Sequence, residues 1–532
     1  MDEKTVQVRN KWMILAILAL AVSIIVIDGT IINVALPVII KDLHLNFTNA
    51  EWIITLYSLI FSSLLITTGR INDVLGRKKL LIIGVVFFII GSILASLSHG
   101  IEMMLVARSV QGVGGAIVLP TTLSTVNTFF KGHERIIAFA VWGSVISGMA
   151  AVGPLLGGIF TTYLNWRWVF WINLPIGLLI IIGALIYIPE NYGEKWEGKF
   201  DILGFLLSVI SFGSLVYALI EGRNYGWIYA KEASQAIDGL SRIPYLLLLG
   251  IIILICLVFW EKHLIKQGKS HLISLNLFKV KSFSIGNLIA CIVAIGEFGL
   301  LFVLPLFLQN VLFLSAMQAG LLLCLLGVGA FFAGGFATPF VKKTSPAIVV
   351  STGLLLEALA LLGFFLTIKV NTSTVWIAAW LIVYGIGLGF ASAQLTSIVM
   401  RDVPDEKAGQ GSSIQSTVRQ LGSALGVAII GTIFVSFLWQ DVPGSLRDIP
   451  NLPPKVAVQV ENSVINSAGS SIVALKNDPQ YTAMLPEPVR NHLVKDLSQT
   501  FTKSVVKAIG VSSIILFMSF LFTFWLPKKK TE

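Results

Sequence analysis

The chain has 532 residues, of which 55% are hydrophobic and only 12% are charged, and its mean hydropathy is +0.85. An ordinary soluble domain has about 25% charged residues. These values exclude a soluble globular protein and indicate an integral membrane protein. The net charge of +10 does not indicate a nucleic-acid surface, because Lys and Arg gather in short segments between apolar runs, where they anchor cytoplasmic loops.

Fourteen apolar segments are long enough to cross a bilayer, which takes about 20 residues. An even number of spans predicts that both termini lie on the same side, and the distribution of Lys and Arg predicts that this side is the cytoplasm. The first segment is too long for a signal-peptide core and has no small-residue cleavage site, so we expect it to be retained. The segments lie near 13–36, 52–69, 80–98, 103–127, 137–162, 168–188, 202–221, 243–260, 284–308, 315–339, 347–368, 375–399, 412–438 and 504–526.

An acidic residue, Asp28, interrupts the first span in the string Ile24-Ile-Val-Ile-Asp-Gly-Thr30. A rise of 1.5 Å per residue puts it roughly 22 Å into a hydrocarbon core about 30 Å thick. A charge at that depth costs about 2.5–3.5 kcal/mol on insertion scales, so such residues are functional candidates. A carboxylate there can gain or lose a proton as its surroundings change, and we predict that Asp28 carries protons. The alternative is a structural hydrogen-bond acceptor that never titrates.

A short basic turn, Gly69-Arg-Ile-Asn-Asp-Val-Leu-Gly-Arg-Lys-Lys79, separates the second and third spans. Gly69 and Gly76 allow a sharp turn or close backbone packing, and Asp73 can pair with a cation or with a helix N-terminus. Arg77 and Lys78 would hold the turn on the cytoplasmic side. An ordinary basic loop accounts for the cations alone, so we predict that this segment takes part in conformational change.

Four further features fall inside later spans. Arg108, in Leu105-Val-Ala-Arg-Ser-Val-Gln-Gly112, is expected in the outer half of the fourth span, where the alternative is an arginine that snorkels to the interface. Glu297 and Glu357 lie near the middle of the ninth and eleventh spans. Each is a candidate second proton site or counter-charge for cationic substrates, and Glu357 can instead pair with a polar neighbour. Arg419, at the inner end of the thirteenth span, is predicted to be a gate or interface residue.

The fifth span contains Gly148-Met-Ala-Ala-Val-Gly-Pro-Leu-Leu-Gly-Gly158. Small residues at Gly148, Gly153, Gly157 and Gly158 let helix backbones approach closely. Pro154 removes a backbone donor and can bend the helix. A generic glycine contact explains the glycines but not the Gly153-Pro154 pair.

These strings resemble the major facilitator superfamily, and in particular its fourteen-span drug:proton antiporter family. The turn from Gly69 to Lys79, the Asp28 string, the Arg108 string and Gly148–Gly158, which is similar to the antiporter motif of exporters, carry the resemblance. In one departure, Val74 follows Asp73, where the family commonly has arginine. The resemblance implies an all-α polytopic membrane protein with a major facilitator fold of two six-helix bundles plus two extra helices, and cytoplasmic N- and C-termini.

The same resemblance implies a domain organisation. Residues 1–190 would form the N-terminal six-helix bundle, 191–280 a two-helix insert with its linkers, and 281–532 the C-terminal six-helix bundle. Substrate would be held near the midplane between the bundles. Since spans 1 and 4 are neighbours in this fold, Arg108 is expected to tune the proton affinity of Asp28.

The segment 440–502, between the last two spans, is too polar to cross the membrane. It is predicted to be an extracytoplasmic loop. The alternatives are a pair of surface helices over the exit, a docking site for a partner and a poorly ordered excursion. Of these we favour a partly helical segment.

The sequence therefore predicts a proton-coupled efflux transporter of hydrophobic, cationic drugs or toxic small molecules that works by alternating access. Protonation of Asp28, together with Glu297, would compete with substrate binding. One alternative keeps the fold and exports a specific metabolite, siderophore, lipid or peptide. Another is a non-transporting membrane receptor or scaffold whose outer 440–502 region binds a partner.

Other classes of activity have little support. We find no complete nucleotide-binding motif, metal-ligand cluster or nucleophile–base arrangement in the sequence, so we expect no cofactor, no metal and no enzyme activity. The expected partners are a small-molecule substrate, protons and the lipid bilayer, and neither nucleic acid nor nucleotide. In a cell with two membranes a periplasmic adaptor protein would be added. The expected location is the inner or plasma membrane, with multiple passes.

Overall fold

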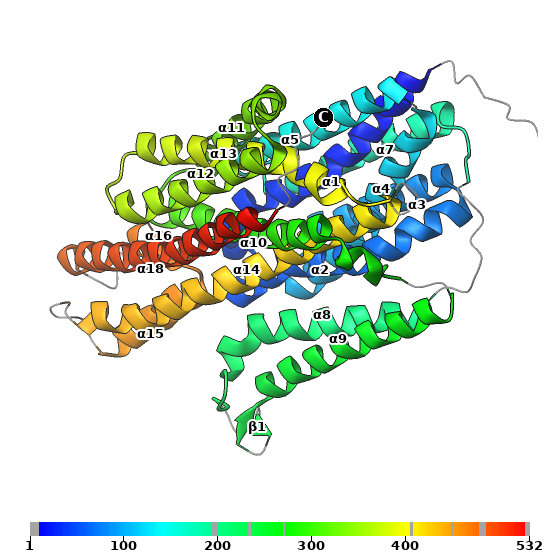
Figure 1. Ribbon diagram of the computed structural model, residues 1–532. Helices are drawn as coiled ribbons and strands as arrows, with labels where there is room; N and C mark the ends of the chain where they lie inside the picture. The colour runs from blue at the N-terminus through cyan, green and yellow to red at the C-terminus, as the bar shows by residue number, and fades with distance from the viewer. Residues whose placement is uncertain are drawn as a thin grey trace, which may run out of the picture.

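The computed structural model is built almost entirely of long helices (Figure 1). It describes residues 10–130, 132–192, 201–231, 236–237, 239–269, 272–404, 408–447, 449, 452, 454–477 and 486–526. Twelve helices in the described residues are long and apolar enough to cross a membrane. Helices α2 and α5, of 29 and 32 residues, occupy two further predicted spans. The predicted all-helical polytopic fold is confirmed.

The first group of helices runs from α1 to α7. Helix α1 packs against α5 and α7, whereas α4 packs against α2 and α3. The sixth predicted span begins with the single turn of α6 and continues as α7. The elements are α1 (Lys11–Asp42), α2 (Phe47–Leu75), α3 (Arg77–Ser96), α4 (Ile101–Phe129), α5 (Gly132–Tyr163), α6 (Trp168–Trp171) and α7 (Asn173–Tyr187).

The second group repeats this pairing. Helix α10 packs against α14 and α18, and α13 packs against α11 and α12. Two seams join the groups, one between α5 and α11 and the other between α2 and α14. The elements are α10 (Lys281–Asn310), α11 (Ala316–Lys343), α12 (Pro346–Thr367), α13 (Thr374–Met400), α14 (Ala408–Arg447) and α18 (Glu487–Phe522), followed by the short η4 (Thr523–Trp525).

Two helices, α8 (Ile202–Tyr225) and α9 (Arg242–Lys266), form a hairpin beside the two groups, below them in Figure 1. Between them β1 (Ala236–Ile237) and β2 (Leu240–Ser241) form a short antiparallel pair. The hairpin packs against the α2–α14 seam through α8. After α9 the chain returns to α10 through the 3-10 helix η2 (Leu275–Lys279).

The segment predicted as the 440–502 loop is helical over much of its length. Helix α14 continues to Arg447, α18 already begins at Glu487, and α15 (Pro454–Asn466) and α16 (Ser470–Asn477) lie between them, at the left end of the molecule in Figure 1. The Asn310 side chain at the end of α10 donates a hydrogen bond to the Ala468 carbonyl at 2.9 Å. We call the side that bears α15 and α16 the outer side, after the predicted topology.

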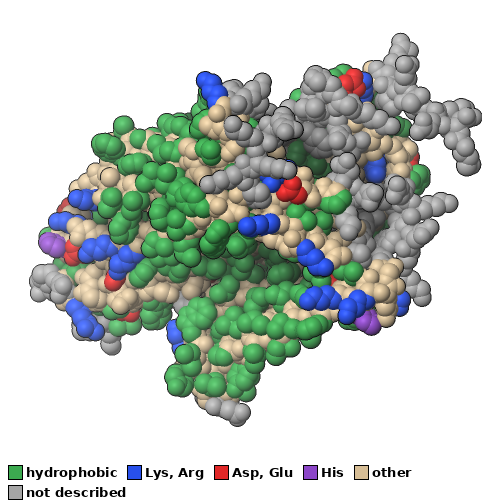
Figure 2. All heavy atoms as spheres, in the orientation of Figure 1, with side chains coloured by type: hydrophobic (Ala, Val, Ile, Leu, Met, Phe, Trp, Pro, Cys, Tyr) green, Lys and Arg blue, Asp and Glu red, His purple; other side chains and the backbone are tan. Residues whose placement is uncertain are grey.

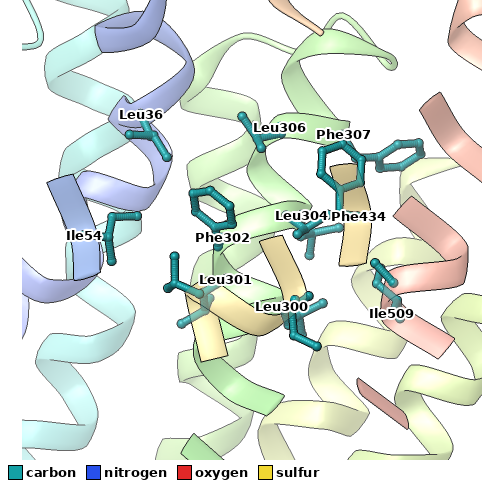
Figure 3. Close-up of a cluster of buried hydrophobic side chains, with 14 of the residues drawn as sticks. Leu36, Ile54, Leu300, Leu301, Phe302, Leu304, Leu306, Phe307, Phe434 and Ile509 are labelled. Carbon is teal, nitrogen blue, oxygen red and sulfur yellow. The ribbon is translucent and has the colours of Figure 1, made fainter. Parts of the chain in front are cut away.

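The main hydrophobic core joins both groups at the outer side. Figure 3 shows Leu36 and Ile54, from α1 and α2, facing a row of α10 side chains that includes Phe302. The fully buried ring of Phe47, at the start of α2, lies 5.3 Å from the Phe302 ring and 5.7 Å from the Phe434 ring of α14, between ring centroids. Aromatic contacts therefore close the outer side between the two groups.

Candidate functional site

Asp28 lies near the middle of α1, and its side chain is completely buried. Its neighbours along α1 are almost all aliphatic, which explains why this stretch forms a membrane helix although it contains a carboxylate. A buried carboxylate requires compensating partners, and here they come from two other helices.

Three side chains donate hydrogen bonds to the Asp28 carboxylate. Arg108 Nη1, from α4, lies 2.7 Å from Oδ2 and forms an ion pair in which both side chains are at most 1% exposed. Gln111 Nε2, one turn further along α4, lies 2.9 Å from Oδ1. Asn173 Nδ2, from the start of α7, lies 3.2 Å from the same oxygen. The site therefore joins α1, α4 and α7.

A second layer holds these donors in place. Arg108 also donates from Nε to the Ile53 carbonyl of α2 at 3.1 Å, and its guanidinium lies over the Tyr57 ring at 4.2 Å. The Ser92 hydroxyl of α3 accepts from both Gln111 and Asn173, at 2.9 and 3.1 Å. Helices α1, α2, α3, α4 and α7 thus meet at one polar cluster.

The chemistry of the cluster follows from its donors. Every described partner of Asp28 is an N–H group, so the carboxylate acts purely as an acceptor, which is the behaviour of its ionised form. Arg108 supplies the matching positive charge, and it stays protonated under all relevant conditions. The arrangement is a sealed, neutral ion pair. Removing either charge, or moving α1 relative to α4, would leave the other charge buried and uncompensated.

The second group of helices contains another acid–arginine pair, which is more open. Arg419 Nη2 of α14 lies 3.5 Å from Glu297 Oε2 of α10, and the two side chains are 50% and 10% exposed. Arg419 was predicted to be a gate or interface residue, and the structure places it beside one of the predicted acids. The longer distance and the exposure of Arg419 make this pair weaker than that of Asp28.

Glu357, the third predicted acid, is completely buried in α12. Neither carboxylate oxygen has a hydrogen-bond partner among the described residues, and Gly387 of α13 packs against its side chain. The Tyr384 hydroxyl of α13 is likewise buried without a described partner. A buried acid without a described donor is a candidate for the protonated form, since a lone buried charge is costly.

The glycine motif of α5 faces two different helices. A Cβ at Gly153 would lie 1.9 Å from Thr30 Oγ1, and one at Gly157 would lie 2.7 Å from the Ile31 carbonyl oxygen, both on α1. A Cβ at Gly158 would instead lie 2.7 Å from the Ala316 carbonyl oxygen, at the start of α11.

The remaining members of the motif differ from one another. The Pro154 carbonyl oxygen of α5 would lie 2.3 Å from a Cβ built at Gly320 of α11. Gly148 has open space around the position where its Cβ would be. Helix α5 is therefore packed between the Asp28 helix on one side and the second group of helices on the other.

The turn predicted over 69–79 is shorter in the structure. Residues 69–75 continue α2, and the chain reverses at Gly76, whose φ of +95° is a conformation that glycine adopts readily. The prediction of a loop was wrong here because a single glycine with positive φ is enough to separate α2 from α3. The side chain of Asp73 and the packing around Gly69 lie outside the described residues.

The α2–α3 turn is docked on the end of the first group. Arg77 donates from its side chain to Thr128 Oγ1 of α4. Lys78 donates from Nζ to the Leu185 carbonyl of α7 at 2.9 Å, and from its backbone to Glu190 Oε1 at 3.2 Å. These contacts fix the inner ends of α3, α4 and α7 relative to one another.

The prediction missed three polar residues at these sites. Gln111 and Asn173 were inside quoted or predicted segments, and the spacing of Gln111 three residues after Arg108 places both on one helix face. Glu51 precedes the predicted second span and was not considered. It is completely buried, and a Cβ at Gly431 of α14 would lie 2.2 Å from its Oε1, so this acid lies in the α2–α14 seam.

Comparisons with known proteins match this architecture. A family model described as Major Facilitator Superfamily matches residues 18–427. The chain is 32% identical over 453 residues to a "Probable actinorhodin transporter" of Streptomyces coelicolor, covering 82% of this chain and 75% of that protein. It is 31% identical over 438 residues to the "Multidrug efflux pump LfrA" of Mycolicibacterium smegmatis, covering 82% and 83%.

A solved structure shares the fold. The crystal structure of a bacterial homologue of the human lysosomal transporter Spinster, in an inward-facing and unoccupied conformation, matches with a TM-score of 0.62. The sequence identity is 17%, and the match covers 99% of each chain.

Proposed function

The chain belongs to the major facilitator superfamily, and on this premise we propose that it is a proton-coupled exporter of hydrophobic cations. Members of this family are membrane transporters and not enzymes, and this chain is a multi-pass protein of the plasma membrane. The relative named as a multidrug efflux pump supports export as the direction of transport. We place both termini in the cytoplasm, in accordance with the distribution of Lys and Arg.

The observation that carries the proposal is the sealed ion pair of Asp28 and Arg108. Asp28 is on α1 and Arg108 on α4, so a shift of α1 against α4 separates the charges. A proton that binds Asp28 removes the penalty of an unpaired buried carboxylate. Proton binding and helix movement are therefore linked, because each makes the other more favourable.

Glu297 provides the site for the cationic substrate. Its only described partner, Arg419, is half exposed and 3.5 Å away, so an incoming cation can replace that arginine at modest cost. Glu357, buried in α12 behind this pair, is proposed as a second proton-binding acid. Protonation of Asp28 would then be coupled to helix movement, while Glu297 would bind the cationic substrate.

Alternating access follows from the two seams. The aromatic contacts of Phe47 with Phe302 and Phe434 close the outer side in this conformation. Opening that side while closing the opposite one would move substrate from cytoplasm to exterior, as rocking of two bundles does in transporters built from repeats. The glycine contacts of α5 allow α1 and α11 to slide at close range.

A second candidate keeps the mechanism and changes the cargo. The match to a probable actinorhodin transporter favours export of one specific metabolite. In that case Glu297 would contribute to recognition of a defined molecule rather than of cations in general.

The test uses everted membrane vesicles with an acidified lumen and a pH-sensitive fluorescent dye. Ethidium added outside should release protons from the lumen and restore fluorescence with the wild-type protein, and Asp28→Asn should abolish this response. The matched control is Asp42→Asn, which removes another acid from α1. The Asp42 side chain is 47% exposed and is paired with Arg167. This variant should behave as the wild type.

Asp28→Glu, which keeps the charge, should retain part of the response. Because Asp28→Asn is expected to be less stable, each response is divided by the amount of folded protein in the vesicles, measured by size-exclusion chromatography after solubilisation. Proton release by Asp28→Asn at the wild-type rate would rule out Asp28 as the coupling residue. A wild-type protein that responds to no lipophilic cation would favour the specific-metabolite exporter.

A further inference from the structure

A cavity of about 360 Å³ lies where the α8–α9 hairpin meets the seam between α2 and α14. All four helices and the segment from Leu272 to Phe278 contribute to its wall. Figure 2 shows hydrophobic side chains along the hairpin and in the recess between it and the bundles above. The cavity lies towards the inner ends of these helices, since α9 contributes residues up to Glu261 and α14 contributes its early residues from Ile414.

The hairpin is anchored to the seam on the outer side of the cavity. There Trp52 of α2 donates from Nε1 to Glu221 of α8 at 2.9 Å, and Thr432 of α14 donates to the Leu219 carbonyl at 3.0 Å. A small apolar cluster from α2, α8 and α14 fills the space around these bonds. Towards the inner side, the described side chains leave the space of the cavity open.

The wall of the cavity contains one ionisable side chain, Glu261, and few other polar groups. The hydroxyls of Ser63 and Ser208 already donate to carbonyls of their own helices, each at 2.8 Å. Glu261 Oε2 accepts the backbone N–H groups of Leu272 and Ile273, at 3.0 and 3.2 Å, and so holds the floor of the cavity.

Among the hydroxyl groups in the wall, one differs from the others. The Thr417 hydroxyl of α14 is 7% exposed as a residue, lines the cavity and has no hydrogen-bond partner among the described residues. A buried hydroxyl without a partner is unfavourable, and a ligand that supplies an acceptor or donor removes that penalty. Most of the other wall residues are aliphatic or aromatic.

We propose that this cavity binds the hydrocarbon chain of an uncharged amphiphile, with a hydroxyl or carbonyl oxygen of that molecule on Thr417. Its volume falls within the range of small-molecule sites, which are mostly apolar with a few polar groups. An apolar cavity excludes water and binds apolar guests instead. The surrounding membrane supplies such chains, either from its lipids or as dissolved lipophilic substrates.

An occupant would touch α2 of one bundle, α14 of the other and both hairpin helices. Any rocking of the bundles changes the shape of this space. A chain that fits one arrangement better than the other therefore shifts the equilibrium between them. Binding of a chain in this cavity does not require proton coupling, so either can be absent while the other is present.

The test is photolabelling of the purified full chain in lipid nanodiscs with a diazirine-bearing dodecyl alcohol, followed by mass spectrometry of the labelled peptides. Label is expected on wall residues such as Phe212 and Leu421. Val258→Trp fills the cavity from the hairpin side and should remove this label. Ile255→Trp, whose parent side chain is 49% exposed on the same helix, is the matched control and should leave the label unchanged.

A milder variant, Thr417→Val, keeps the shape and should weaken labelling about fivefold, the effect of losing one hydrogen bond. A phospholipid that stays bound to the wild type but not to Val258→Trp in native mass spectrometry would identify a lipid chain as the natural occupant, and displacement of the label by an uncharged lipophilic antibiotic would identify a substrate. Both outcomes support the site. Label confined to membrane-facing residues and unaffected by Val258→Trp or Thr417→Val would overturn it.

Discussion

Replacing Asp28 by asparagine should destabilise the first bundle strongly. Arg108 would remain charged, because an arginine in a protein does not lose its proton, and it would be buried without a counter-ion. Removing one partner of a buried pair costs about 3–5 kcal/mol. The exposed fractions of 0% and 1% leave no route by which water could replace the lost carboxylate.

The size of the effect can be expressed as a temperature. A domain of 150–250 residues loses about 2–4 °C of its unfolding midpoint per kcal/mol, so the midpoint should fall by about 10 °C. The control Asp42→Asn breaks a pair whose acid is 47% exposed, and such pairs contribute about 0–1 kcal/mol. Its midpoint should fall by no more than about 4 °C.

The double variant Asp28→Asn/Arg108→Gln separates the charge from the packing. It contains no unpaired buried charge, so it should recover most of the stability lost in the single variant. The assay is the fraction of monodisperse detergent-solubilised protein left after heating, measured by size-exclusion chromatography. The reasoning is refuted if Asp28→Asn matches the Asp42→Asn control, or if the double variant loses the sum of both single effects.

Three further outcomes are expected. Gly157→Ala places a methyl group 2.7 Å from a backbone oxygen of α1 and should lower the free energy of unfolding by about 1–3 kcal/mol, as measured in the same heating assay. Gly148→Ala meets open space and should be neutral. Equal effects of the two substitutions would contradict the assigned packing. Glu297→Gln should raise the KM for ethidium transport and leave an uncharged substrate unaffected, and an equal change for both would remove Glu297 as the cation site. Phe47→Ala should loosen the outer closure. A cysteine introduced in place of Leu36, in a chain whose native cysteines have been replaced, should then react faster with an impermeant maleimide added outside. An unchanged reaction rate would place the closure elsewhere.

The sequence was sufficient to find the charged residues and the helices that carry them. A carboxylate or guanidinium inside an apolar span is conspicuous, and hydropathy alone therefore located Asp28 and Arg108. Their contact was expected only because the resemblance placed spans 1 and 4 together. The pairing of Glu297 with Arg419 was not expected, since nothing in either span indicates which neighbour an isolated charge meets.

Neutral polar residues were harder to place. Gln111 and Asn173 complete the Asp28 cluster, but amides and hydroxyls are common in membrane helices and often bond only to their own backbone, as Ser63 does. Glu51 was missed because the hydropathy pattern places the start of the second span at residue 52, whereas the helix begins at Phe47. Helix ends in a membrane protein are set by packing as well as by polarity, and a hydropathy window does not register packing.

The aromatic closure at Phe47 also bears on the energetics of the cycle. Burying one phenylalanine side chain is worth about 1.5–3 kcal/mol. One proton that crosses a potential of 100 mV releases about 2.3 kcal/mol. A single proton therefore supplies about the free energy needed to expose Phe47 alone, and the other contacts of this closure with Phe302 and Phe434 can open only if apolar surface is buried on the inner side in the same movement. In the proposed proton-coupled cycle the two closed states would therefore be nearly equal in free energy, and a proton gradient would only have to set the direction in which the protein cycles.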